Sequence, residues 1–196
     1  MADILDFPPV APQSMQWGLA HNTKSFTSAF NGATQTVTYP GARWRCQMTF
    51  GTLRPDEERM LSTFINRLGG RAGRFRLSDL YRVSPVSRGN AVVDGGGQTG
   101  GLLRTRGWIP SRRVLRMGDY VTVDNEMKEV LDDVWSDAGG KAVLRVAPWW
   151  RFSPTNAATV NHTSPVAIMM LDDDENMIGR QRRLSNCTIT CTEAFS

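Results

Sequence analysis

The sequence predicts a mainly β protein: a β-sandwich or split-barrel domain with one α-helix, interrupted by a small inserted β-barrel. Several short segments alternate apolar and polar residues at period two, which is typical of half-buried strands. Only one segment has helical spacing, and 18 Gly and 10 Pro provide many turns between the segments. With 196 residues, the chain is long enough to bury a core without disulfide bonds.

The first half of the chain contains the clearest strand pattern. We expect strands at residues 15–19 and 34–39, followed by a turn at Pro40 and Gly41. Residues 43–50 alternate most regularly and predict a half-buried antiparallel strand. The residues on its apolar face are Trp44, Cys46, Met48 and Phe50.

One helix is predicted from Pro55 to Leu68. Pro55 suits the first helical position, the next three residues are acidic, and Gly69 supplies a stop signal. Helical spacing places an apolar stripe on one side of the helix and polar residues on the other. The stripe comprises Met60, Leu61, Phe64, Ile65 and Leu68, and the outward residues are Arg59, Asn66 and Arg67. Residues 74–79 then resume strand alternation.

The second half begins with a Gly-rich stretch, residues 84–101, that we interpret as a linker and loop. Short strand patterns follow at spacings typical of a small barrel. These patterns cover residues 112–117, 120–123, 128–134 and 141–146. Residues 166–171 and 186–193 then predict a closing hairpin. We therefore expect one β-rich domain from residues 1–84 and 155–196, and an inserted small barrel at residues 85–154.

Composition limits the classes of function. Twenty of the 23 basic residues are Arg, and the net charge is only +4. Arg with few Lys is more typical of protein interfaces than of non-specific nucleic-acid binding. No apolar run could span a bilayer, and the first residues do not form a leader sequence, so we expect a soluble protein made in the cytosol. Cys46, Cys187 and Cys191 are expected to be buried free thiols.

The motifs associated with catalysis or cofactors do not have the context that they require. His21 and His162 have no metal-ligand spacing, and no G-x-S-x-G sequence is present. The stretch Gly95–Gly100 satisfies G-x-G-x-x-G, but no helix can open after it, so we interpret it as a loop. Asp172 begins a partial calcium-loop pattern that fits a solvated hairpin turn better. We expect no enzyme activity, no metal and no cofactor.

Aromatic and Arg residues in the predicted barrel allow two interpretations. They could stack on bases or sugars, as small barrels often do, or they could fill the core or an interface. The aromatic candidates are Trp108, Tyr120, Trp135, Trp149 and Trp150.

The order of these elements resembles that of the distal tail proteins of siphophages. The resemblance rests on residues 35–50, the helix, residues 73–79 and the inserted segment 118–148, and it extends over most of the chain. It implies an OB-like insert and a hexameric ring around a lumen through which DNA passes. The implied partners are the tail tube protein and the tail hub or baseplate protein, with the tape-measure protein as a further candidate. The protein would then belong to the virion tail, assembled in the cytoplasm of the host bacterium, without membrane insertion.

A ring requires heterologous interfaces, in which one face of a subunit meets a different face of the next. We expect exposed Arg side chains to meet carboxylates there, and the candidates are Arg43, Arg45, Arg59, Arg67, Arg71 and Arg74. The alternative function is that of a carbohydrate- or nucleic-acid-binding OB-like module acting in host attachment.

Overall fold

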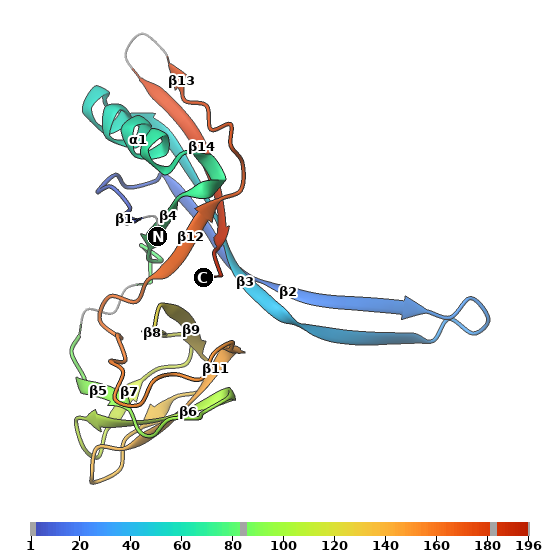
Figure 1. Ribbon diagram of the computed structural model, residues 1–196, viewed down its shortest axis with the longest axis vertical. Coiled ribbons are helices and arrows are strands. Elements are labelled where there is room, and N and C mark those ends of the chain that lie inside the picture. The colour runs from blue at the N-terminus through green and yellow to red at the C-terminus, as the bar shows by residue number, and fades with distance from the viewer. Residues whose placement is uncertain (1–2, 83–85, 181–183, 196) are drawn as a thin grey trace.

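The larger of two β units is built from both ends of the chain. The computed structural model describes residues 3–82, 86–180 and 184–195. In these residues a seven-stranded sheet has the order β1-β4-β12-β14-β3-β2, and β13 pairs with β14 (Figure 1). Its strands are β1 (Ile4–Asp6), β2 (Ser14–Thr27), β3 (Thr34–Leu53), β4 (Arg74–Leu77), β12 (Ala167–Leu171), β13 (Gly179–Arg180) and β14 (Ser185–Glu193). The antiparallel pairing of β12 with β14 confirms the predicted closing hairpin.

Helix α1 (Pro55–Leu68) covers one face of this sheet and has the predicted boundaries. The Arg54 N–H donates to the Glu57 carboxylate at 2.9 Å at its start, and Gly69 adopts a left-handed conformation (φ 62°) at its end. A short 3-10 turn, η1 (Gly70–Ala72), follows. The apolar stripe is buried except for Met60, which is 41% exposed.

The first core lies between α1 and the sheet. Trp44, Cys46, Met48 and Phe50 are all buried, which confirms the alternation predicted for residues 43–50. Phe64 of the helix packs edge-to-face on Phe75 of β4, with ring centroids 5.4 Å apart. All three cysteines are buried and unpaired, as expected.

Residues 20–43 differ from the prediction. Instead of turning at Pro40 and Gly41, β3 continues, and β2 and β3 form one long hairpin. Residues 40–42 lie opposite the single residue His21, because Ala20 pairs with Arg43 and Asn22 pairs with Tyr39. This bulge accommodates Pro40, and Gly41 has a φ of 105° within it. The chain reverses at residues 28–33 instead.

The smaller unit contains a five-stranded sheet with the order β5-β6-β11-β9-β8 and a two-stranded sheet of β7 and β10. Its strands are β5 (Gly89–Val93), β6 (Gly100–Trp108), β7 (Arg113–Leu115), β8 (Tyr120–Val123), β9 (Glu126–Val130), β10 (Val134–Trp135) and β11 (Ala142–Trp150). The interpretation of residues 84–101 as linker and loop was therefore wrong for β5, where Ala91 and Val93 are buried, and for the start of β6. Residues 83–85 lie outside the described part of the chain.

The second core belongs to this smaller unit and extends beyond residue 154. Val160 is buried in it, Thr159 pairs with Val92, and Asn161 pairs with Thr122. Residues 157–162 therefore add to the smaller unit, and the chain leaves it later than the predicted boundary. We call residues 88–162 the β-insert.

Candidate assembly site

A two-stranded arm projects from the molecule (Figure 1). Residues 21–41, here called the arm, project from the sheet and point away from both β units (Figure 1). Every one of these residues is exposed except Ser28 and Val37, which are half-buried. The paired residues from Asn22 to Thr27 span about 20 Å at strand rise. The arm has no core of its own.

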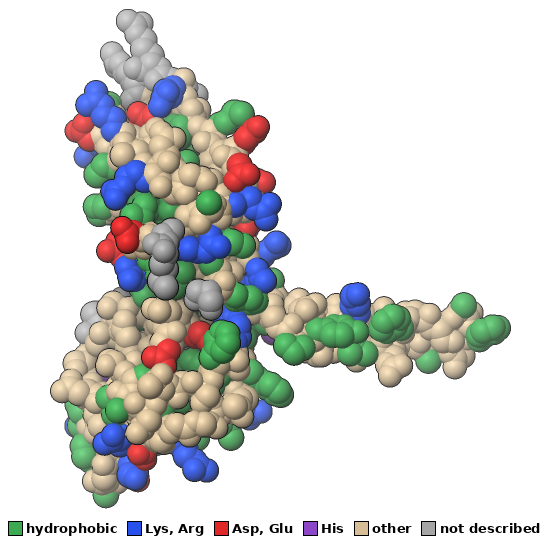
Figure 2. Space-filling view, in the orientation of Figure 1, with side chains coloured by type: hydrophobic (Ala, Val, Ile, Leu, Met, Phe, Trp, Pro, Cys, Tyr) green, Lys and Arg blue, Asp and Glu red, His purple; other side chains and the backbone are tan. Residues whose placement is uncertain are grey.

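The arm has two chemically different faces. Strand pairing places Thr23 opposite Thr38 and Asn22 opposite Tyr39, and adjacent pairs alternate in side. One face consists of hydroxyl side chains: Thr23, Ser25, Thr27, Thr34, Thr36 and Thr38. The other face is mixed: Asn22, Lys24, Phe26, Gln35, Val37 and Tyr39. Figure 2 shows hydrophobic side chains along the arm and at its end.

The tip of the arm exposes a phenyl ring. Phe30 is fully exposed, and the turn that carries it is held by the hydroxyl of Ser28 and the side-chain carbonyl of Asn31, which accept backbone hydrogen bonds. Phe26 and Tyr39 are also largely exposed on the mixed face. A two-stranded hairpin is at best marginally stable alone in water. A long hairpin that exposes aromatic rings is therefore suited to packing on another surface.

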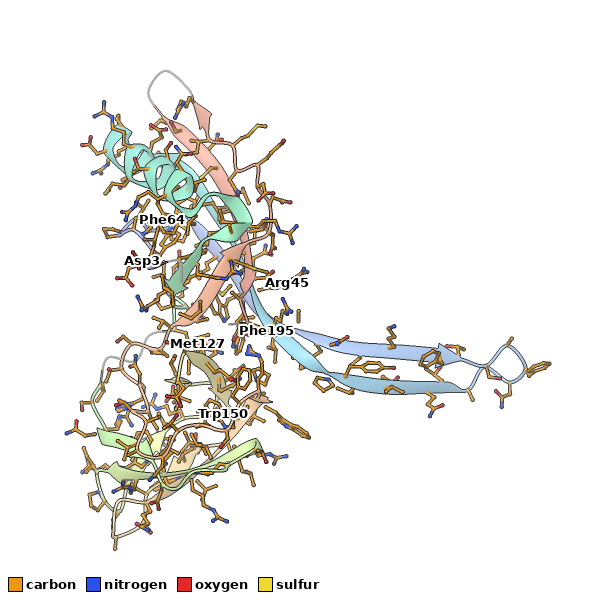
Figure 3. The ribbon with its side chains drawn as sticks, in the orientation of Figure 1. Asp3, Arg45, Phe64, Met127, Trp150 and Phe195 are labelled. Atoms are coloured by element: carbon orange, nitrogen blue, oxygen red, sulfur yellow. The ribbon has the colours of Figure 1, made fainter. Side chains whose placement is uncertain are left out.

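The arm begins at a buried charge cluster between the two β units (Figure 3). Glu193 of β14 accepts a hydrogen bond from the Trp44 N–H at 3.2 Å, and its other oxygen lies 2.5 Å from Nη2 of Arg151. The ring of Phe195 lies between two guanidinium groups, with Arg43 and Arg151 each 3.8 Å from its centroid. These contacts join the base of the arm, the last sheet strand and the β-insert.

Lys128 of the β-insert extends this cluster. Its ammonium is fully buried, lies 2.6 Å from the Glu126 carboxylate and donates to the Trp149 carbonyl at 3.3 Å. Arg151 is 3.7 Å from the same Glu126 carboxylate. Desolvation by burial lowers the pKa of Lys128, and the hydrogen bond to Glu126 opposes this effect. Two cations and two carboxylates therefore balance each other inside the molecule.

Further contacts fix the two units together. The indole of Trp44 donates to the Met127 carbonyl at 2.8 Å and meets the ring of Tyr120 edge-to-face. The Thr122 hydroxyl exchanges hydrogen bonds with the backbone of Val166. Tyr120 and Met127 are members of the first core, although they belong to the β-insert.

The six Arg residues expected at a subunit interface do not lie in one patch. Arg45 projects from the face of β3 opposite the core, whereas Arg59 and Arg67 lie on the helix that covers the core. The guanidinium of Arg74 donates to three nearby carbonyls, one of which belongs to Arg71. Arg43 packs on Phe195. Of the six residues, only Arg43 and Arg45, both on β3, therefore lie close to the arm.

The aromatic residues suggested as a stacking platform are also separated. Trp108 is buried and donates to the Thr105 hydroxyl at 2.7 Å, and Tyr120 and Trp150 are buried as well. Their role as exposed stacking surfaces was wrong, because the core requires large side chains. Trp135 and Trp149 are 64% and 73% exposed.

The residues that the structure describes contain no group of three His, Cys, Asp or Glu side chains placed to hold a metal ion. Within the same ranges, no helix has the length and apolar character needed to cross a membrane. Comparison with protein-family models and with curated proteins found no match to this chain.

The sequence prediction missed the arm, Glu193 and Phe195. The signal for the arm was that Ser or Thr alternates with other residues in both 22–27 and 34–39. Two segments with the same alternation can pair in one register that places all the hydroxyl side chains on the same face. No local pattern indicates that Glu193 and Arg151 meet, because this contact depends on the packing of two units.

Proposed function

We propose that this protein is a structural component of a bacteriophage tail, of the distal tail type, in which six copies form a ring. In this proposal the ring joins the tail tube to the tail-tip hub or baseplate, and the protein has no catalytic role. The proposed class of protein rests on the resemblance of the order of its elements to that of siphophage distal tail proteins. The projecting arm is the single observation that carries the assembly role.

The arm supports this proposal because, among the residues that the structure describes, none covers its mixed face. It points away from both β units, and its strands have free backbone edges on both sides. If each arm packs on the body of the next copy, the contact is heterologous and closes by rotation. Phe26, Val37 and Tyr39 would supply the apolar contact in that interface.

The rigid base of the arm also favours assembly. The cluster of Arg43, Phe195, Arg151 and Glu193 fixes the strand from which the arm leaves the sheet. A preorganised arm loses less conformational entropy when it docks than a flexible one. Arg43 and Arg45, near the base, remain the candidates for ion pairs with a neighbouring copy.

The test is the solution mass of the purified protein by light scattering, followed by negative-stain imaging. We expect closed rings of about six times the 21.8 kDa chain mass. In the first variant, the dipeptide Asn-Gly replaces residues 21–42 and links Ala20 to Arg43, since these two residues are paired and a two-residue turn suits them. This variant should be a folded monomer.

A second variant changes only the mixed face: Phe26→Ser, Val37→Thr and Tyr39→Ser. Its matched control changes the hydroxyl face, Thr36→Val and Thr38→Val, and keeps the side-chain shape. We expect the first set to lose the ring and the control to keep it. Rings that persist after removal of the arm would contradict the assembly role of the arm, and a wild-type protein that stays monomeric at high concentration would contradict the ring.

A further inference from the structure

A groove on the outer surface of the β-insert is separate from the arm and its base. It has a volume of about 620 Å³ and lies between β10 and the paired strands β6 and β11. This volume is within the range of sites for small ligands, roughly 300–1,000 Å³. The groove is lined by Asp94, Arg104, Thr105, Trp135, Asp137, Lys141, Ala142 and Val143.

One wall of the groove is an exposed indole. Strand β10 has only two residues, and Val134 points into the second core, so the alternation of the strand turns Trp135 outward. Val143, more than half exposed on β11, adds to the apolar surface. A Trp ring held at the edge of a groove offers a flat apolar face beside a polar N–H group.

The rest of the groove is polar, and its two carboxylates are held in place. The Asp94 carboxylate lies 3.2 Å from the Lys141 ammonium and 3.4 Å from Nε of Arg106. Oδ1 of Asp137 accepts hydrogen bonds from the N–H groups of Gly139 and Lys141, both at 2.8 Å. The fixed carboxylates provide acceptors, and the ammonium provides donors.

The charges in the groove balance. Two cations, Arg104 and Lys141, face two carboxylates, Asp94 and Asp137. A single-stranded nucleic acid requires an excess of cations along its backbone, so this groove does not suit it. A neutral ligand with many hydroxyl groups satisfies both the donors and the acceptors and adds no charge to the set.

We propose that this groove binds a neutral oligosaccharide, with the apolar face of a sugar ring stacked on Trp135. Asp94 and Asp137 accept hydrogen bonds from the sugar hydroxyls, and Arg104 and Lys141 donate to them. This binding function is independent of the ring, because the groove lies on the β-insert and the arm leaves the larger unit (Figure 1).

The test is calorimetric titration of the full-length protein with maltohexaose, cellohexaose and chitohexaose. We expect saturable binding of at least one of them with a dissociation constant below about 1 mM, which is weak but measurable. Trp135→Ala and Arg104→Ala should each weaken that binding at least about tenfold. The matched control is Trp149→Ala, which removes an equally exposed indole that does not line the groove.

Circular dichroism should show that all three variants remain folded, since the changed side chains are exposed. The proposal is overturned if none of the three sugars binds at about 10 mM, a concentration at which even weak sites fill. Equal losses in the Trp149 control and the Trp135 variant would also overturn it. Preferential binding of a thymidine dodecamer, with steep salt dependence, would assign the surface to nucleic acid instead.

Discussion

The three thiols illustrate how burial controls chemistry at the scale of single residues. Cys187 is buried on β14, and desolvation raises its pKa to about 11. Cys191 lies four residues further on and is paired in register with Cys46. A hydrogen bond that the Cys191 thiol donates to Cys46, together with burial, raises the pKa of Cys191 well above its usual value. Because the thiolate is the reactive form, both thiols should be inert at neutral pH.

We predict that the free energy of unfolding falls as the pH rises from about 9 to about 11, in part because of Cys187. The pKa of Cys187 is raised in the folded state. The protonated thiol therefore contributes to the free energy of unfolding in full below the unfolded pKa, and this contribution is lost as the pH rises through the folded pKa. The measurement is urea denaturation across this range for the wild type and for Cys187→Ala. The decrease in the free energy of unfolding between about pH 9 and about pH 11 should be smaller in the variant than in the wild type, by up to about 2 kcal/mol. Equal slopes would contradict the raised pKa of Cys187.

At the scale of elements, α1 and the arm differ in how their local sequence relates to burial. The local pattern of α1 matches its buried face, whereas that of the arm does not account for its exposure. The helix has its Pro start, acidic first turn and Gly stop within one segment, and its stripe is buried as the spacing predicts except at Met60. The arm has good strand pairing but no buried face, so its stability depends on what it contacts. Propensity explains why residues 22–27 and 34–39 are strands, but not why they remain exposed.

We predict that backbone amides of the arm in the free chain exchange with solvent at least about tenfold faster than those of residues 46–50 on the same strand β3. The reason is that the arm ribbon has one partner strand, whereas residues 46–50 lie between β2 and β14. The measurement is hydrogen exchange followed by mass spectrometry on monomeric protein. Protection of the arm should then increase on assembly. Equal protection of both segments in the monomer would show that the arm is already covered.

At the scale of the whole molecule, the two β units are joined by buried polar contacts as well as by apolar packing. Glu193 is 2% exposed and lies against Arg151, which belongs to the other unit. Removing one partner of a buried ion pair leaves an uncompensated charge, and this is strongly destabilising. The contact between Glu193 and Arg151 therefore helps to hold the two units in their relative position.

We predict that Glu193→Gln lowers the free energy of unfolding by about 3 kcal/mol, because Arg151 then loses the nearer of its two carboxylates and keeps only Glu126, 3.7 Å away. Chemical denaturation measures this loss. The matched control is Asp132→Asn, which removes an ion pair of 3.8 Å whose side chains are both more than 60% exposed. That change should cost less than about 1 kcal/mol. Similar small losses for both variants would mean that the Glu193 contact does not stabilise the junction.

The sequence by itself determined those features that depend on neighbouring residues. It predicted the β-rich class, the boundaries of α1, the apolar face of residues 43–50 and the buried thiols, because spacing and capping are local properties. It was wrong where the local signal was ambiguous. A Pro-Gly pair usually marks a turn, but at Pro40 a bulge absorbs it. The Gly-rich stretch 84–101 resembled a linker, although it contains β5, whose Ala91 and Val93 enter the second core.

Only the tertiary structure decided which side chains meet across the fold. Strand alternation alone cannot show that Trp108 and Trp150 are buried while Trp135 and Trp149 are exposed, because that depends on which sheet covers each strand. The cluster around Glu193 joins Arg151 to a residue more than forty positions away, and the arm is exposed because none of the other residues that the structure describes lies over it. Long-range packing, which no local pattern contains, fixes both features.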